Sequence, residues 1–364
     1  MTRMTSPFPK LELEGPPRKV GFDHGRLLGD RIAVSIDHYR TSFEKQAGLE
    51  WSTALDLASA LTPTLRERAP DLVEEMEGIA QGSENPLEVI VALNARTGLL
   101  RTTPAAVENA EAECTTGAAL PAKTKDGHTI LFGNWDQNVR CLENSAVLEV
   151  RVPDRLPVLF LTEAGILMRT GFNSAGIGIT GNSLASELDG TVAGGIPWPI
   201  VRRQVLQQDR ISEALKVVFE SPRAHSGNHV VADAEGFAVD LEATPGEVFT
   251  ITPEDDLVFH SNHFISPGAC ARVSDRQVGR SPSTLYRVSR LAEGVKAAGD
   301  QVTIETIQNA LRDHFGHPDS VCAHPTEDRR STTVASHISD LTARTLFISS
   351  GPPCENPYQR YQLN

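Results

Sequence analysis

Roughly the first 110 residues of the chain carry apolar side chains at the spacing of helix faces. One such series lies in 54–61 and a second in 72–79, the latter behind Asp71, a residue type that caps helix starts. Proline is favoured in the first turn of a helix, so we expect a third helix from Pro86 to Leu100. The pattern therefore predicts a mostly helical N-terminal region.

The pattern changes at Cys114, where short runs of β-branched and aromatic residues begin, separated by turn signals such as Lys125-Asp126-Gly127. The expected strands are 114–120, 129–136, 146–152, 158–162, 166–172, 176–180, 228–232, 238–241, 247–251, 257–262, 332–339 and 345–349. The expected helices are 197–207, 211–220, 281–298 and 303–315. Strands in blocks, then helices, then more strands indicate an α+β protein rather than strict βαβ alternation.

Composition narrows the classes of function. The 364 residues include 40% hydrophobic ones, enough for a substantial core, and the formal charge of -13 disfavours nucleic acid and anionic membranes as partners. No apolar run reaches the ~20 residues of a membrane helix, and the start lacks a signal-peptide core. Five scattered cysteines fit a reducing compartment better than a disulfide framework. We expect a soluble, cytoplasmic protein.

Cys114 stands where the helical region gives way to the first strand, in Glu113-Cys114-Thr115-Thr116. A thiol there can attack the carbonyl of its own preceding peptide bond. The hydroxyl of Thr115 or of Thr116 can assist this cleavage by hydrogen bonding. Hydrolysis of the resulting thioester leaves a free α-amine with a reference pKa of about 7.7–8.0, which can take the thiol proton near neutral pH. The alternative is a buried structural cysteine at a strand edge.

Two later segments supply partners for a nucleophile. In 129–136, side-chain alternation places Asn134 and Asp136 on one face and Trp135 on the other, so the carboxylate can hold an α-ammonium or orient a substrate amine. In 257–262, Asn262 offers an amide donor to a developing oxyanion. We interpret His260, on the same face, as a hydrogen-bonded core histidine.

Other interpretations compete with this one. His314, His317, Cys322 and His324 include metal-ligand types, but their spacing matches no tight zinc pattern, and we expect packing and hydrogen bonding there and no metal. An uncut protease with His260 or His263 as base would remain one polypeptide. The run 176–181 resembles a dinucleotide fingerprint but follows a turn and opens no helix, so a hairpin is expected.

The chain resembles the acyl-coenzyme A:6-aminopenicillanic acid acyltransferase family, peptidase family C45, within the N-terminal nucleophile (Ntn) hydrolases. The resemblance covers nearly the whole chain and rests on motifs that are individually weak but occur in order. They are Gly21-Phe22-Asp23-His24-Gly25, 74–80 with 93–96, Glu113-Cys114-Thr115-Thr116, Gly133-Asn134-Trp135-Asp136, 171–177, His260-Ser261-Asn262-His263, Asp313-His314, 320–322 and Gly351-Pro352-Pro353-Cys354.

The resemblance implies an αββα sandwich in one Ntn-hydrolase domain. Residues 1–113 would be a helical precursor segment that stays as a partner fragment after cleavage, and 114–364 would hold the catalytic core. It also implies a Cys114 thioester formed from a small amide or acyl thioester, no cofactor, and acyl-coenzyme A as one candidate substrate. A homo-oligomer is a candidate assembly, and a non-catalytic binding protein that keeps the fold is the alternative.

By position, Cys114 is similar to the family nucleophile, Asp136 to the acid that orients its amine, and Asn262 to the oxyanion donor. Candidate residues lining the site are Asn134, Trp135, His260, His263, Arg330 and Ser331. Fungal members have glycine where this chain has Glu113, so a charge adjoins the bond to be cut. Related bile-salt and penicillin V hydrolases carry arginine where this chain has Gly133, so an arginine that assists the thiol is not to be assumed. The tail around Arg329, Arg330, Ser331 and Thr332 resembles a segment that lines the site in the family, and the resemblance leaves open which arginine faces inward.

Overall fold

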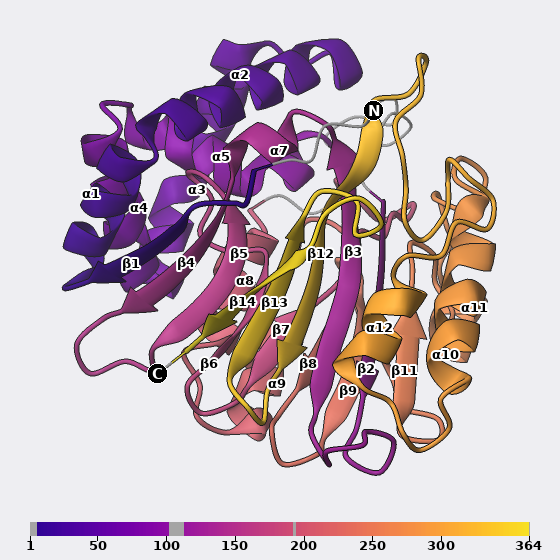
Figure 1. Ribbon diagram of the computed structural model, residues 1–364. Helices are drawn as coiled ribbons and strands as arrows, with labels where there is room; N and C mark the ends of the chain where they lie inside the picture. Colours follow the sequence, from indigo (N-terminus) through magenta and orange to yellow (C-terminus); the bar gives the residue numbers. More distant parts are fainter. Residues whose placement is uncertain (1–5, 102–112, 192–193, 364) are drawn as a thin grey trace.

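Two β-sheets lie face to face in the molecule, with helices on the outer side of each (Figure 1). The computed structural model describes residues 6–101, 113–191 and 194–363. Buried side chains from both sheets, such as Leu159 and Leu346, share one hydrophobic core between the sheets. The predicted α+β class with αββα layers is confirmed.

One sheet has eight strands in the order β1-β4-β5-β6-β7-β8-β9-β10. Their bounds are β1 Lys10–Glu14, β4 Ser145–Arg151, β5 Val158–Glu163, β6 Thr170–Asn173, β7 Gly178–Thr180, β8 Gly227–Ala232, β9 Ala238–Ala243 and β10 Val248–Ile251. The edge strand β1 runs parallel to β4, whereas β4 and β5 pair antiparallel. Because β1 comes from the N-terminal region, that region is part of the sheet and not a purely helical attachment.

The second sheet has six strands in the order β11-β2-β3-β12-β13-β14. Their bounds are β2 Glu113–Ala119, β3 Ile130–Asn138, β11 Leu257–His260, β12 Ser331–Asp340, β13 Thr345–Ser350 and β14 Tyr358–Gln362. β2 lies between β11 and β3 and pairs antiparallel with both. The first strand after the helical region is therefore an inner strand.

Helices form the two outer layers. Those whose apolar faces join the core over the eight-stranded sheet are α1 Pro17–Leu27, α2 Gly29–Gln46, α3 Trp51–Arg68, α4 Pro70–Gly82, α5 Leu87–Leu99, α8 Trp198–Val205 and α9 Ile211–Glu220. On the six-stranded sheet pack α11 Ser283–Lys296 and α12 Ile304–Ala310 (Figure 1). Short α7 Cys141–Asn144 and α10 Pro267–Arg272 lie in connections.

Most predicted elements are confirmed to within a few residues, and α9 has the predicted bounds. The 176–181 run belongs to the β6–β7 hairpin, as expected. The cap assigned to Asp71 is wrong, since Ala69 is the cap and Asp71 lies in the first turn of α4. The periodicity did not resolve β1, β14, α7 or α10, which are short.

Three predicted elements are shorter than expected, namely β11, α12 and β6. β11 ends at His260, where Ser261 and Asn262 turn to Cys114. α12 ends at Ala310, and Asp313 accepts the Phe315 N–H in a turn of its own. β6 begins only at Thr170.

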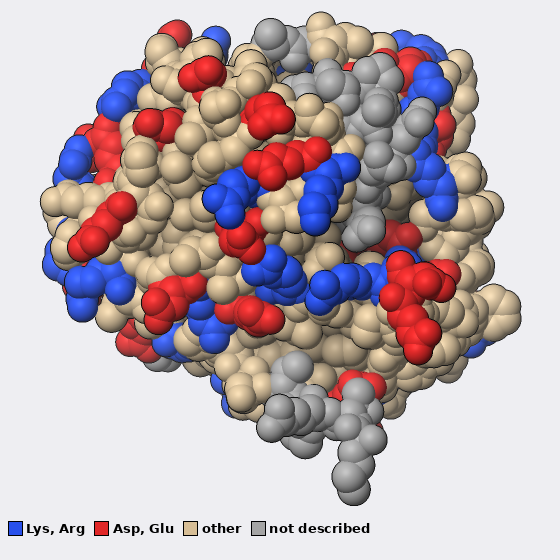
Figure 2. Space-filling model, turned by 90° about the horizontal axis from the view of Figure 1, so that it is seen from above, with Lys and Arg blue, Asp and Glu red and all other residues tan. Residues whose placement is uncertain are grey.

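The surface agrees with the charge balance of the sequence. Figure 2 shows acidic and basic side chains interspersed over the face in view, without a continuous basic band there. Among the helices of the described part of the chain, none has the length and apolar character to cross a membrane.

Candidate active site

β2 presents its residues alternately to two different environments. Cys114 is paired with Trp135 of β3, and both side chains belong to the core between the sheets. Glu113 is paired with Asp136, which confirms that Asp136 and Trp135 lie on opposite faces of β3. The thiol and the two carboxylates therefore flank the Glu113–Cys114 bond from opposite sides of the sheet.

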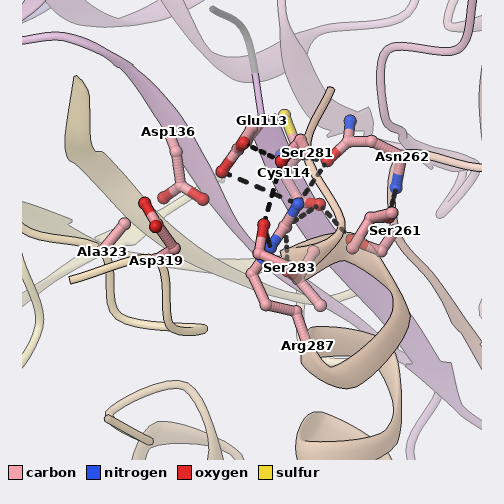
Figure 3. A network of polar contacts seen from close by, with 12 residues as sticks. Glu113, Cys114, Asp136, Ser261, Asn262, Ser281, Ser283, Arg287, Asp319 and Ala323 are labelled. Atoms are coloured by element: carbon pink, nitrogen blue, oxygen red, sulfur yellow. Dashed lines mark hydrogen bonds and ion pairs between the residues drawn. The ribbon is translucent and has the colours of Figure 1, made fainter. Parts of the chain in front are cut away.

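The backbone of Cys114 is held by side chains beyond the end of β11. The Cys114 N–H donates to Asn262 Oδ1 at 2.8 Å, and the Ser261 hydroxyl donates to the Cys114 carbonyl at 3.0 Å (Figure 3). The Asn262 amide nitrogen donates to the Ser183 carbonyl at 2.9 Å. In the uncut chain Asn262 thus faces Cys114 with its oxygen, and its role as an oxyanion donor stays a prediction.

Arg287 of α11 is the central cation on this face (Figure 3). Its guanidinium donates to the Cys114 carbonyl and to Thr115 Oγ1, each at 2.8 Å, and to Asn262 Oδ1 at 3.0 Å. The side chain is fully buried. A planar group with several donors can hold these three acceptors at once, which a lysine ammonium cannot do with the same geometry. Arg287 therefore fixes the backbone on the C-terminal side of the Glu113–Cys114 bond.

The Glu113 carboxylate, on the other side of that bond, is neutralised by neighbours. Arg329 donates to it at 3.0 Å, Arg287 lies 3.7 Å away, and Ser281 donates a further hydrogen bond. Burial alone would raise the pKa of Glu113, but the two arginines outweigh it and hold the pKa below its usual value. The charge next to the bond is thus compensated. Of the two tail arginines between which the sequence left the choice open, Arg329 faces inward and contacts Glu113, whereas Arg330 is exposed.

Asp136 is completely buried beside this network. One carboxylate oxygen accepts from Thr333 Oγ1 at 2.6 Å, and the other has no hydrogen-bond partner among the described residues. Burial raises the pKa of Asp136 to about 7, although Arg287 and Thr333 oppose the rise. A buried, half-satisfied carboxylate next to Glu113 and Cys114 is suited to receive a cation or proton.

The thiol itself lies against an arginine that the sequence analysis did not expect. Arg169 Nη2 is 3.7 Å from Cys114 Sγ, and its guanidinium carbon lies 3.8 Å from the centre of the Trp135 ring. Burial raises the pKa of the Cys114 thiol, and the Arg169 charge opposes part of that rise. This cation comes from the β5–β6 connection and not from Gly133 of β3, the position at which no assisting arginine was assumed.

A cavity of about 100 Å³ is lined by Arg169, whose guanidinium contacts the Cys114 thiol. Arg169, Asn182 and Ser183 line it, and through them it borders Cys114 and Asn262. Three further arginines line the cavity: Arg96, Arg101 and Arg202. Arg96 pairs with Glu163 and Arg101 with Asp189.

Arg169 lies 3.9 Å from Glu163, whereas Arg202 has no acidic partner among the described residues. Arg202 donates to the Arg169 backbone carbonyl at 2.9 Å, and its Nε has no partner among the described residues. Burial lowers the pKa of Arg202 to about 9, and the neighbouring Arg169 contributes in the same direction. The cavity therefore favours an anionic group.

The other predicted residues have structural contacts away from the cavity. Asn134 donates to the carbonyls of Leu311 and Val321, and His263 contacts Thr284 Oγ1 at 2.8 Å. Six residues that were candidates for lining the site are not among the described residues that line this cavity. They are Asn134, Trp135, His260, His263, Arg330 and Ser331.

His260 is a core histidine, as interpreted from the sequence. Its ring nitrogens lie 3.0 Å from Glu242 Oε1 and 2.6 Å from the Ser261 carbonyl, and it is completely buried. Burial alone would lower the pKa of His260, but the carboxylates of Asp240 and Glu242 raise it by more, so the pKa lies above its ordinary value. Because both ring nitrogens of His260 are engaged in these contacts, the geometry does not favour His260 as a base for Cys114.

The threonines after the nucleophile are also engaged. Thr116 donates to Asn182 Oδ1 at 2.5 Å, while Thr115 accepts from Arg287. The contacts of Arg169 and Arg287 were not predicted from the sequence, whereas Arg329 belongs to the tail segment that the family resemblance singled out. The available signal for Arg169 was an arginine within an otherwise apolar stretch, because arginine is rarely buried without a partner.

Comparisons with known proteins agree with the motifs. A family model described as acyl-coenzyme A:6-aminopenicillanic acid acyl-transferase matches residues 122–354, a range that begins after Cys114 and includes Asp136, Asn262 and Arg287. The chain is 28% identical over 360 residues to the acyl-coenzyme A:6-aminopenicillanic-acid-acyltransferase 40 kDa form of Emericella nidulans, covering 96% of this chain and 94% of that protein.

More distant similarities extend the comparison. An uncharacterized protein of Archaeoglobus fulgidus is 24% identical over 310 residues, which are 72% of this chain and 51% of that protein. A mutant conjugated bile acid hydrolase from Clostridium perfringens has a TM-score of 0.45 at 12% identity, covering 68% of this chain and 97% of that one. Penicillin V acylase from Agrobacterium tumefaciens has a TM-score of 0.39 at 14% identity, covering 65% and 83%.

Proposed function

Because the chain belongs to the acyl-coenzyme A:6-aminopenicillanic acid acyl-transferase family, we propose that it is a self-cleaving cysteine enzyme that hydrolyses or transfers the acyl group of a small amide or acyl thioester. The observation that carries this proposal is that side chains hold both residues of the Glu113–Cys114 pair in place. Asn262 and Arg287 hold the Cys114 backbone, while Arg329 and Ser281 hold the Glu113 side chain.

The first reaction is cleavage of the chain. Cys114 Sγ attacks the carbonyl carbon of Glu113, the peptide C–N bond breaks, and the thiol proton ends on the new α-amine. Water then attacks the thioester, which forms a carboxylate on Glu113 and restores the thiol. Asn262 Oδ1, which accepts from the Cys114 N–H in the uncut chain, can accept from the amine that replaces it. The half-satisfied carboxylate of Asp136 supports a role in holding positive charge nearby.

The second reaction is turnover. The α-amine of Cys114 takes the thiol proton, and Sγ attacks the acyl carbonyl of the substrate. The amine or thiol leaving group departs with that proton, leaving an acyl thioester on Cys114. Water or an acceptor amine then resolves it. Arg169 stabilises the thiolate from 3.7 Å, and the Asn262 amide group is the candidate oxyanion donor if it turns after cleavage.

The cavity supports a small substrate with a negative group. Its volume of about 100 Å³ is below the several hundred Å³ of pockets for drug-sized ligands, and Arg202 brings an unbalanced positive charge. An N-acyl amine with a carboxylate fits these properties. The intact coenzyme A portion of an acyl donor would have to remain largely outside.

The test is to trap the thioester. Purified enzyme is mixed with N-acyl amines that carry a carboxylate, quenched in acid and analysed by intact mass. We expect the acyl mass on the fragment that begins at Cys114, and its absence in Cys114→Ala. Cys270→Ser, at an exposed free cysteine, is the matched control and should keep the adduct. Release products with and without an added acceptor amine distinguish transfer from hydrolysis. Turnover by an undivided wild-type chain would favour the uncut protease instead.

A further inference from the structure

Four side chains of metal-ligand type meet outside the active site. They come from the connection between α12 and β12 and from the tail after β13, and they are His314, Cys322, His324 and Cys354. One ligand atom from each lies within 4.8 Å of all the others. The spacing of His314, Cys322 and His324 alone matches no tight zinc pattern, because the fourth residue, Cys354, lies 30 residues beyond His324.

Four of the six distances between these ligand atoms lie close to the edges of a zinc tetrahedron, and the remaining two are no longer than 4.8 Å. The two sulfurs are 3.5 Å apart, and the His314 and His324 Nε2 atoms are 3.1 Å apart. His324 Nε2 lies 3.6 Å from the Cys322 sulfur and 3.4 Å from the Cys354 sulfur. Zinc bonds of ~2.3 Å to sulfur and ~2.0–2.1 Å to nitrogen give tetrahedral edges of roughly 3.3–3.8 Å. The sulfur separation is also far above a disulfide bond of about 2.05 Å.

We propose that His314, Cys322, His324 and Cys354 bind one structural Zn²⁺ ion. Two thiolates and two neutral imidazoles balance the charge of a divalent ion, and Cys₂His₂ is a donor set typical of zinc. Glu355 lies 3.7 Å from Nδ1 of His324, on the ring nitrogen that would not bind the metal. A carboxylate in that position orients a histidine ligand. Four protein ligands leave no open position, so the site is structural and not catalytic.

The position of the site indicates which segments a bound zinc ion would hold together. Ala323, between two of the ligands, exchanges hydrogen bonds with Thr333: Ala323 N donates to Thr333 Oγ1 at 2.9 Å, and Thr333 N donates to the Ala323 carbonyl at 3.0 Å. The same Thr333 hydroxyl donates to Asp136 at 2.6 Å. Figure 3 shows Ala323 close to Asp136. Zinc would therefore fix the tail at Cys354 to the loop that positions Asp136.

The test is the metal content of untagged, full-length protein purified without chelator and dialysed against buffer with and without Zn²⁺. We expect about one zinc per chain by elemental mass spectrometry. Cys354→Ser and Cys322→Ser should lose it, whereas Cys270→Ser should keep it, because Cys270 lies outside the cluster. Removal of zinc from the wild type by a strong chelator should lower the melting temperature, and re-addition of Zn²⁺ should restore it.

Three outcomes would overturn the proposal. One is wild-type protein without zinc even after dialysis against Zn²⁺, a measurement that does not depend on any variant folding. Another is zinc retained undiminished by both cysteine variants. The third is a thiol titration in denaturant and chelator that finds two of the five cysteines consumed in a Cys322–Cys354 disulfide.

Discussion

On one face of β2, the Cys114 thiol meets Arg169 and Trp135 beside a cavity, whereas on the other face Glu113 and Thr115 are held by Arg287 in a closely packed layer. The two faces belong to one strand, so a shift of a single residue would exchange them. Under the proposed function, the packed face would hold the bond that is cleaved and the cavity face would receive the substrate. Substitutions on the two faces should therefore separate chain cleavage from turnover.

The largest expected effect is on the packed face. Arg287→Leu should stop or greatly slow cleavage, because the Cys114 carbonyl and Asn262 Oδ1 lose a buried donor. In an uncut Cys114→Ala background it should lower the free energy of unfolding by about 3–5 kcal/mol, as for other buried charges that lose a partner. Urea unfolding and gel analysis measure the two effects. Arg272→Leu, at an exposed pair with Glu247, should cost no more than about 1 kcal/mol. Cleavage of Arg287→Leu at the wild-type rate would contradict the role of the packed face.

Asn262 sharpens the comparison because its two amide atoms have different partners. Asn262→Asp keeps an oxygen to accept from the Cys114 N–H but lacks the amide donor. It should therefore be cut and yet show kcat lower by about 100- to 1,000-fold, the usual loss of an oxyanion donor. Asn262→Ala, which lacks both atoms, should be impaired in both reactions. Normal cleavage and full turnover in Asn262→Ala would show that the assignment is wrong.

The raised pKa of Asp136 predicts that the free energy of unfolding of the uncut chain depends on pH. Its pKa rises from 3.8 to about 7 on folding, so between these values the folded state keeps a proton that the unfolded state has lost. This group's contribution to stability is present below pH ~4 and is lost as the pH rises through about 7, with a slope of at most about 1.4 kcal/mol per pH unit. Urea unfolding of Cys114→Ala with and without Asp136→Asn isolates the effect. Parallel curves for the two proteins would exclude it.

The smallest expected effect lies on the cavity face. Arg202→Gln should raise KM by about 10- to 100-fold for a substrate with a carboxylate, since a charged hydrogen bond contributes about 1.5–3 kcal/mol. The same substrate with a carboxamide in place of the carboxylate is the control and should show little change. Chain cleavage should be normal. An equal rise in KM for both substrates would exclude recognition of the anion.

The sequence pattern predicted those features that depend on neighbouring residues alone, such as helix bounds and the alternation of side chains along a strand. The bounds of α9 followed from its apolar spacing, and the opposite facing of Asp136 and Trp135 followed from strand alternation. The contacts of Arg169 and Arg287 depend on which elements the fold brings beside β2, 55 and 173 residues along the chain, and spacing carries no information on that. The same reason applies to the cluster of His314, Cys322, His324 and Cys354, because Cys354 reaches it from a separate strand connection.

The most direct test of the whole account is the intact mass of freshly purified wild-type protein beside Cys114→Ala. The account predicts two wild-type fragments that divide the chain between Glu113 and Cys114, with 251 residues in the second (364 − 113 = 251), and a single undivided Cys114→Ala chain. An active wild-type protein that stays undivided would contradict it.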